Sequence, residues 1–135
     1  MYGLIGKTLV HSFSKNFFTE KFEREGIDDK YELFELPEIE RFRDLIDNVP
    51  LNGLNVTIPY KEQVMQFLDE IDETAKAINA VNTVKFMRKA DGSLFLKGYN
   101  TDVIGFSESL RPLLKDHHKH ALVLGTGGAA KAVAY

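Results

Sequence analysis

The chain has 135 residues, a hydrophobic fraction of 44%, a formal net charge of −3 and no cysteine. This length and composition predict a folded globule with a real core, and the lack of cysteine excludes disulfide and thiolate chemistry. The small negative charge favours neither nucleic acid nor an anionic membrane as a partner. No apolar run approaches the roughly 18 residues of a membrane helix and the N-terminus has no signal-peptide pattern, so we expect a cytoplasmic protein.

The first part of the chain alternates between strand and helix patterns. Short apolar runs bounded by turn residues predict strands over residues 2–6, 31–36 and 54–58. Apolar side chains at helical spacing predict helices over residues 14–25, 37–49, 59–71 and 73–78. Gly26 is placed to end the first of these helices, and Pro37 and Pro59 suit helix starts.

A hairpin and one more helix are expected next. Strand patterns over residues 81–88 and 93–97 flank Asp91-Gly92, which is a strong turn signal. Residues 102–114 carry a helical stripe that Pro112 should kink or end. Strands that alternate with helices predict an α/β fold, with a mostly parallel sheet flanked by helices and a hairpin that contributes antiparallel strands.

The last fifteen residues carry a cofactor-binding pattern. Residues 121–125 predict a buried parallel strand, Gly125-Thr-Gly-Gly-Ala-Ala130 predicts a phosphate-cradling turn, and residues 131–135 predict the start of a helix. Gly125 allows the tight turn, Gly127 lets the backbone approach a pyrophosphate, and Ala130 lets the helix pack closely on the strand. A glycine loop that caps a helix without any ligand is the alternative.

These patterns divide the chain into a substrate-binding α/β domain (residues 1–116), a linker (117–120) and the truncated first βα unit of a Rossmann domain (121–135). The residue that would choose NAD or NADP is expected about 20 residues beyond this turn, so the chain does not distinguish the two cofactors. One βα unit cannot hold a dinucleotide, so we expect no bound cofactor and no dehydrogenase activity from this chain alone. Its orphaned strand is expected to be disordered or to pack against another copy of the chain.

The segment from Asn55 to Lys61 carries the most chemistry. Asn55 and Thr57 share one face of a predicted strand near its carboxyl end, where α/β sheets bind ligands. Lys61 falls in the first turn of the expected helix, where the positive end of the helix dipole disfavours an ammonium and suits a lysine that transfers protons. A solvated lysine beside two edge polar residues is the alternative.

Other polar positions each leave two interpretations open. Asp102 suits a helix N-cap, and its carboxylate is also suited to hold the Lys61 ammonium. Ser12 and Ser14 suit helix capping, or they offer hydroxyls to a carboxylate or an alcohol. Asn82 suits either bracing of the backbone or binding of a ligand.

The histidines do not indicate a metal site. His11 is expected to pack within its loop. His117, His118 and His120 are too close along the chain to turn three imidazoles towards one ion, so we interpret them as part of a solvated linker.

These motifs, in this order, resemble those of the shikimate dehydrogenase family over essentially the whole chain. His11-Ser-Phe-Ser14 resembles the family's serine pair, and Asn55-Val-Thr-Ile-Pro-Tyr-Lys61 is similar to its strand-to-lysine signature. Ala80-Val-Asn-Thr83 and Asn100-Thr-Asp102 resemble its next two motifs, and Gly125-Thr-Gly-Gly-Ala129 resembles its nicotinamide-cofactor loop. The family usually has proline where this chain has Lys15, and often where it has Thr8, so the conformation of the serine loop is where the two differ.

The resemblance implies a two-domain enzyme that reversibly reduces 3-dehydroshikimate to shikimate with NADP, in aromatic amino-acid biosynthesis. Lys61 is implied to shuttle the proton at the reacting oxygen, with Asp102 as its catalytic partner. The implied substrate-binding residues are Ser12, Ser14, Asn55, Thr57, Lys61, Asn82 and Asp102. The implied cofactor-binding residues are Gly125, Thr126, Gly127, Gly128, Ala129 and Glu73. A dehydrogenase that uses quinate, or both acids, and a non-catalytic module that binds a polyhydroxy acid are the alternatives.

Overall fold

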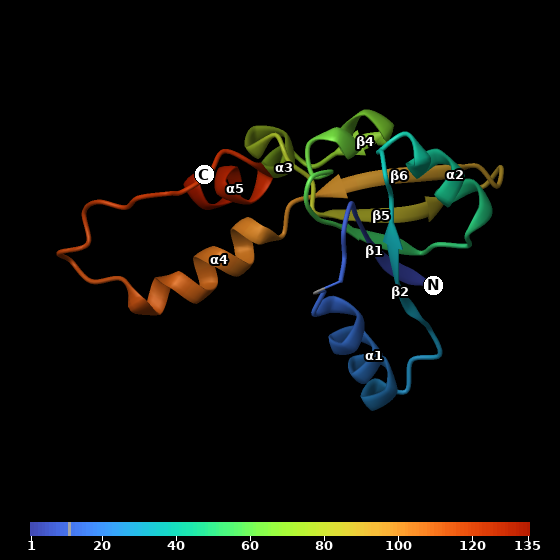
Figure 1. The fold of residues 1–135 in the computed structure, drawn as a ribbon, viewed down its shortest axis with the longest axis horizontal. Helices are drawn as coiled ribbons and strands as arrows, with labels where there is room; N and C mark the ends of the chain where they lie inside the picture. The colour runs from blue at the N-terminus through green and yellow to red at the C-terminus, as the bar shows by residue number, and fades with distance from the viewer. Residues whose placement is uncertain (11) are drawn as a thin grey trace.

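The computed structural model of the chain describes residues 1–10 and 12–135, so the expected packing of His11 lies outside the described residues. Within them, six strands form one sheet in the order β2-β1-β3-β5-β6-β4 (Figure 1). The strands are β1 (Tyr2–Gly6), β2 (Tyr31–Glu35), β3 (Gly53–Val56), β4 (Glu70–Ile71), β5 (Thr83–Arg88) and β6 (Leu94–Tyr99).

Most of the strands run in one direction. β1 pairs in parallel with β2 and β3, and β4 pairs in parallel with β6. β5 runs antiparallel to both of its neighbours, β3 and β6. The β5–β6 hairpin turns at Asp91 and Gly92, and Gly92 adopts the left-handed conformation (φ 84°) that glycine tolerates. The predicted α/β class, the mostly parallel sheet and the antiparallel hairpin are confirmed.

Hydrophobic clusters lie on both faces of the sheet. On one face, Phe18 and Phe22 of α1 (Ser14–Glu25) pack against Leu4 and Tyr31. The opposite face holds the main core, with α2 (Arg41–Asn48) and the 3-10 helix η1 (Gln63–Phe67) packed over it. The central members of this core, each nearly inaccessible to solvent, are Ile5, Phe42, Leu54, Val56, Val64, Val81 and Val84. α1 ends at Gly26 in the left-handed conformation, as predicted.

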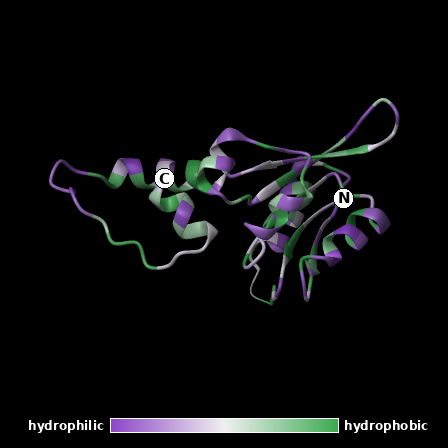
Figure 2. Ribbon diagram, turned by 90° about the horizontal axis from the view of Figure 1, so that it is seen from above, coloured by the Kyte–Doolittle hydropathy of each residue, from purple (hydrophilic) through white to green (hydrophobic). Residues whose placement is uncertain are grey.

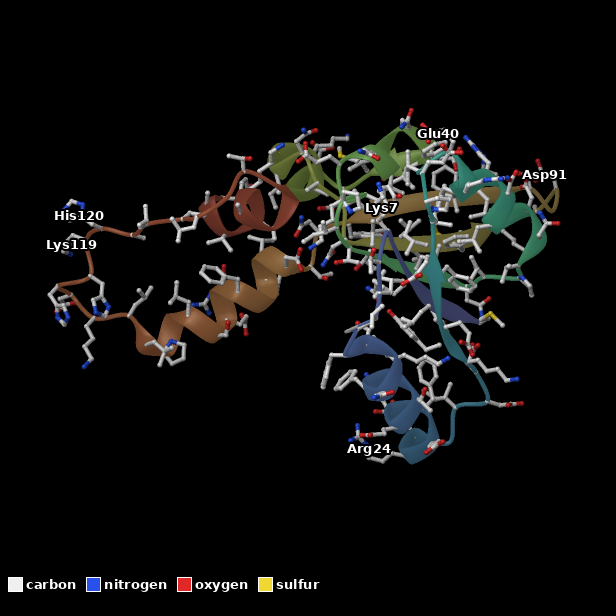
Figure 3. The ribbon with its side chains drawn as sticks, viewed as in Figure 1. Lys7, Arg24, Glu40, Asp91, Lys119 and His120 are labelled. Atoms are coloured by element: carbon white, nitrogen blue, oxygen red, sulfur yellow. The ribbon has the colours of Figure 1, made fainter. Side chains whose placement is uncertain are left out.

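Four helical segments remain to be described. They are α3 (Glu73–Ile78), α4 (Asp102–Leu110), the 3-10 helix η2 (Arg111–Leu113) and α5 (Gly128–Ala134). α4 ends at Leu110 and η2 starts at Arg111, one residue before Pro112, near which the sequence predicts a kink or an end. Figures 1 and 2 both show the chain between η2 and α5 as a long loop leading away from the sheet, and Figure 3 places Lys119 and His120 at its outer end. Among the described residues, no helix combines the length and the apolar character needed to span a bilayer.

Two predicted elements are wrong. Residues 59–71 do not form one helix: turns are followed by η1, and residues 70–71 then pair with β6 as strand β4. The apolar spacing of Val64, Phe67, Leu68 and Ile71 fits a three-residue turn followed by an extended segment as well as it fits an α-helix. The pairing with β6 decides between the two.

The strand predicted over residues 121–125 is also absent. These residues are exposed, with Leu122 83% and Leu124 86% accessible, and no described strand pairs with them. A strand exists only with a partner, because its N–H and C=O groups must be satisfied. α5, which follows these residues, does pack within its own chain, because Ala132 is buried against Ile78 and Ala80.

Candidate active site

Lys61 and Asp102 meet in space, although they are 41 positions apart in the chain. The Nζ of Lys61 lies 2.6 Å from Oδ2 of Asp102. The Lys61 side chain is 13% exposed and that of Asp102 is 34% exposed. The ion pair is therefore held at the rim of the structure, where a ligand can still reach it.

The backbone around Lys61 differs from the sequence prediction. Lys61 lies in a turn after β3, so the expected helix dipole does not act on it from its own segment. The turn is tied down because the carbonyl oxygen of Lys61 accepts a hydrogen bond from the N–H of Val81 at 2.7 Å. The ammonium instead faces the carboxylate of Asp102, which comes from a different segment of the chain.

Asp102 is not the N-cap of α4, which corrects a second expectation. The N-cap is Thr101, and Asp102 is the first residue of the helix. Asn100 satisfies the free N–H groups instead, because its Oδ1 accepts from the N–H of Asp102 at 3.1 Å and of Val103 at 3.4 Å. The carboxylate of Asp102 is thus left free to face Lys61.

Asn82 orients the carboxylate from the other side. Its Nδ2 donates to Oδ1 of Asp102 at 2.8 Å and to Oγ1 of Thr101 at 2.9 Å. Its Oδ1 accepts from the N–H of Thr101 at 2.8 Å, which fixes the direction of the amide. Asn82 is buried, and these hydrogen bonds satisfy its side-chain amide. Bracing of the backbone is therefore present, and Asn82 also faces the adjoining cavity.

A cavity of about 500 Å³ adjoins the ion pair. This volume is within the range of small-molecule sites, roughly 300–1,000 Å³. Every residue that the sequence places in the substrate site lines it: Ser12, Ser14, Asn55, Thr57, Lys61, Asn82 and Asp102. Apolar side chains that include Leu4, Leu9 and Phe18 line the rest, so polar groups converge on an otherwise apolar pocket.

Neither serine occupies the N-cap position of α1. The N-cap position is Phe13 and makes no side-chain capping bond. The Oγ of Ser12 accepts a hydrogen bond from the N–H of Ser14 at 3.3 Å, and both residues are half-buried at the cavity wall. Ser12 therefore satisfies the first N–H of α1 from outside the N-cap position, as Asn100 does for α4, and both serines still line the cavity.

Three residues beside the cavity escaped the site prediction. Thr83 and Thr101 both hydrogen-bond to Asn82 and lie within motifs that the sequence singled out. Tyr31 donates to Oδ1 of Asn55 at 2.8 Å from the neighbouring edge of the sheet. Burial raises the pKa of Tyr31 to about 12, and hydrogen bonding with the Ser14 side chain partly offsets this. No local signal marks Tyr31, because its role depends on which strands become neighbours.

The glycine turn lies beside the same ion pair. Gly125 has a φ of 126°, which only glycine adopts readily, and the space around Gly127 is open. Gly128 packs against Lys61 and Ala80, and Lys131 of α5 pairs with Glu62 at 2.7 Å. The turn can therefore accept a close ligand on one side while it contacts the lysine on the other.

Thr126 and Ala129, the other predicted residues of the turn, are exposed, and the turn lies outside the 500 Å³ cavity. Glu73 is not brought to that cavity either. It starts α3, is 88% exposed and pairs with Lys76 at 2.7 Å. Across the described positions, no group of three or more histidine, aspartate or glutamate side chains is arranged to hold a metal ion.

Comparison with known proteins decides the family. Residues 4–84 match the shikimate dehydrogenase substrate binding domain. This chain belongs to that family. It is 43% identical over its whole length to the NADP(+) shikimate dehydrogenase of Pyrococcus abyssi, of which it covers 49%. The chain thus spans about half the length of the curated relatives it matches.

Solved structures of the shikimate dehydrogenase family share the fold. Shikimate dehydrogenase 1 from Peptoclostridium difficile superposes with a TM-score of 0.87 and 38% identity, over 98% of this chain and 48% of that one. The Thermus thermophilus enzyme, solved in complex with NADP(H) and shikimate, superposes with a TM-score of 0.80 and 34% identity, over 98% of this chain and 49% of that one.

Proposed function

We propose that this chain is the substrate-binding half of an NADP-dependent shikimate dehydrogenase, which reversibly reduces 3-dehydroshikimate to shikimate. The observation that carries the proposal is the Lys61–Asp102 pair at 2.6 Å on the wall of a cavity lined by six other polar side chains. The relatives named above, which include a complex with shikimate and NADP(H), support the choice of substrate and cofactor.

In this proposal Lys61 moves the proton. When a ketone is reduced, its carbon receives a hydride and its oxygen gains negative charge, so a positioned ammonium donates the proton that completes the alcohol. In the reverse direction the amine accepts that proton. Asp102 keeps the Nζ of Lys61 in place, and Asn82 and Asn100 keep the carboxylate in place.

The remaining polar residues would bind and orient the hydroxy acid. Ser12 and Ser14, at one part of the cavity wall, would donate hydroxyl groups to the substrate carboxylate. Asn55, Thr57, Asn82 and Asp102 would hydrogen-bond its hydroxyl groups. Several fixed contacts of this kind hold the reacting carbon in one orientation, which reduces the entropy lost on reaching the transition state.

The glycine turn fits one side of a dinucleotide. The open space at Gly127 and the left-handed Gly125 suit close approach of a pyrophosphate, and Thr126, Gly128 and Ala129 complete the turn. NADP, when bound, supplies or accepts the hydride. Glu73 would lie towards the nicotinamide side, because α3 and α5 are in contact. We expect no stable cofactor binding to this chain alone, since a single turn covers little of a dinucleotide.

The test is turnover by the whole protein that contains this chain. Purified protein with shikimate and NADP+ should reduce the cofactor, followed by absorbance, and it should do so faster with shikimate than with quinate. A preference for quinate would replace the proposed substrate. Absence of turnover with either acid, together with tight binding of one, would favour the non-catalytic binding module.

A matched pair of lysine variants separates catalysis from binding. Lys61→Met should abolish measurable turnover while shikimate binding, measured by calorimetry, stays within about tenfold. Lys97→Met breaks an ion pair of the same 2.6 Å length, with Glu70, at the distant β4–β6 edge and should leave turnover unchanged. Equal turnover in both variants would remove Lys61 from the mechanism.

The isolated 135-residue chain should be inactive and prone to self-association. Its residues 121–125 expose Leu122 and Leu124 without a partner strand, and such a segment pairs readily with a second copy. Light scattering of the chain and of a Leu122→Lys variant should show association in the first only. We also place the whole protein in the cytoplasm, where cell fractionation should recover it.

A further inference from the structure

Tyr31 lies outside the 500 Å³ cavity but contacts three residues that line it. It is the first residue of β2, 3% exposed, and its ring stacks on Phe18 with centroids 4.5 Å apart. Its hydroxyl lies 2.8 Å from Oδ1 of Asn55 and also interacts with the Ser14 side chain. This buried hydroxyl plays no part in the proton transfer proposed above.

Most hydrogen bonds in the network between Asp102 and Tyr31 have a direction set by their partners. The Asp102 carboxylate only accepts, so Asn82 presents Nδ2 to it, and the N–H of Thr101 only donates, so Asn82 presents Oδ1 there. The single proton of Thr83 Oγ1 is directed to Oδ1 of Asn82 at 3.1 Å or to Oγ1 of Thr101 at 3.4 Å. Thr83 can then only accept from Asn55, whose Nδ2 lies 3.3 Å away. Asn55 is left with its carbonyl oxygen towards Tyr31, which must donate.

We propose that Tyr31 is a positioning residue that locks the Asn55 side-chain amide with its N–H groups towards the cavity side. Nδ2 carries two hydrogens, and within the described residues Thr83 takes one of them. The second serves an oxygen of the bound hydroxy acid. The inference rests on the proposed function, because Asn55 acts on substrate only if the cavity is the substrate site.

Without the Tyr31 hydroxyl, the carbonyl oxygen of Asn55 loses the donor that holds it at 2.8 Å, and Thr83 alone then orients the amide. A flipped Asn55 would present an acceptor where the substrate needs a donor. The contact orients the substrate and does not move the proton. Loss of the contact is therefore expected to raise KM for shikimate and to leave kcat nearly unchanged. Burial that keeps the phenol protonated through neutral pH agrees with its role as a donor.

The test compares Tyr31→Phe with Tyr60→Phe in the whole protein. Tyr60 is equally buried, and its hydroxyl donates to the carbonyl oxygen of Leu36 at 2.6 Å on the core side. Tyr31→Phe should raise KM for shikimate about tenfold, with kcat within about threefold and KM for NADP+ unchanged. Tyr60→Phe should leave all three constants within about twofold. An unchanged shikimate KM in Tyr31→Phe would overturn the inference.

Two further measurements distinguish an effect through Asn55 from a general loss of protein stability. In Asn55→Ala, which lacks the amide, adding Tyr31→Phe should raise KM no further, whereas additive effects would contradict a role through Asn55. The side-chain amide signals of Asn55, assigned by NMR with the Asn55→Ala variant, should shift or broaden in Tyr31→Phe. Unchanged amide signals of Asn55 in Tyr31→Phe would contradict the inference even if no turnover is measured. A wild-type protein that turns over neither acid would contradict only the proposed function.

Discussion

Gly128 leaves no room for a side chain beside Lys61. A Cβ added at Gly128 would lie 3.0 Å from the Cβ of Lys61 and 3.0 Å from the Cβ of Ala80. Both of these atoms are bonded to backbone, so neither can move aside as the end of a flexible chain would. The glycine turn and the proposed proton-transferring lysine therefore share one packed contact.

Gly128→Ala in the whole protein should lower kcat by about tenfold, because the methyl group displaces Lys61 from Asp102 by a few tenths of an ångström. Steady-state kinetics with shikimate and NADP+ measure the effect. Gly105→Ala in α4 is the control: nothing lies within 4 Å of an added Cβ there. That variant should keep wild-type kcat and gain about 0.5–1 kcal/mol of stability, because alanine favours the helix. Equal kcat in both variants would show that Lys61 tolerates the contact.

Asp102→Asn in the whole protein should reduce kcat about a hundredfold with a smaller effect on shikimate KM. The amide keeps the shape of the carboxylate but no longer holds the ammonium through its charge. Glu70→Gln makes the same change in the 2.6 Å pair with Lys97 and should leave kcat unaffected. A wild-type kcat in Asp102→Asn would show that the charge of Asp102 is dispensable.

Asn100→Ala should lower the free energy of unfolding of the chain by about 3 kcal/mol, measured by urea denaturation. The variant loses the acceptor for the first N–H groups of α4 and the donor to the carbonyl oxygen of Ala80, 2.9 Å from Nδ2. Asn48→Ala removes an exposed bond to the carbonyl oxygen of Asp44 and should cost about 0.5 kcal/mol. Similar losses in the two variants would mean that Asn100 is not a structural support of the site.

Alkaline pH should destabilise the chain partly through Tyr31. Its pKa in the folded state is about 12, above the unfolded value of 10.0, so its contribution is complete below pH 10 and is lost as pH rises towards 12. The difference in unfolding free energy between wild type and Tyr31→Phe should therefore shrink by about 2 kcal/mol over that window. Tyr60, whose pKa burial also raises, is retained in both proteins and so cancels from the comparison. A constant difference would contradict burial of the phenol.

The elements that local sequence specifies were predictable. β1, α1 and the hairpin follow from short-range apolar spacing and from turn residues such as Gly26 and Gly92, whose conformation needs no distant contact. Residues 59–71 and 121–125 were mispredicted because a strand is decided by its partner: β4 exists through pairing with β6, and residues 121–125 have no described neighbour to pair with.

Some residues of the candidate site were predictable from the sequence and others were not. Motif order was enough to nominate Lys61 and Asp102, whose nearness is set by sheet topology and could not follow from spacing. The role of Asn100 as the acceptor that frees Asp102 was missed because Asp102 is itself a good capping residue. Tyr31 was missed because its hydroxyl meets Asn55 only when β2 and β3 lie on either side of β1.

The reversed direction of β5 separates the candidate site from the tip of the β5–β6 hairpin. Thr83, at the start of β5, is level with Asn55 and Tyr99, whereas Arg88 at its other end is level with Leu94 next to the turn. Figure 3 shows Asp91 at that opposite extremity of the sheet. A fluorophore or an affinity tag inserted at this tip would report on the domain from the end of the hairpin opposite to the candidate site.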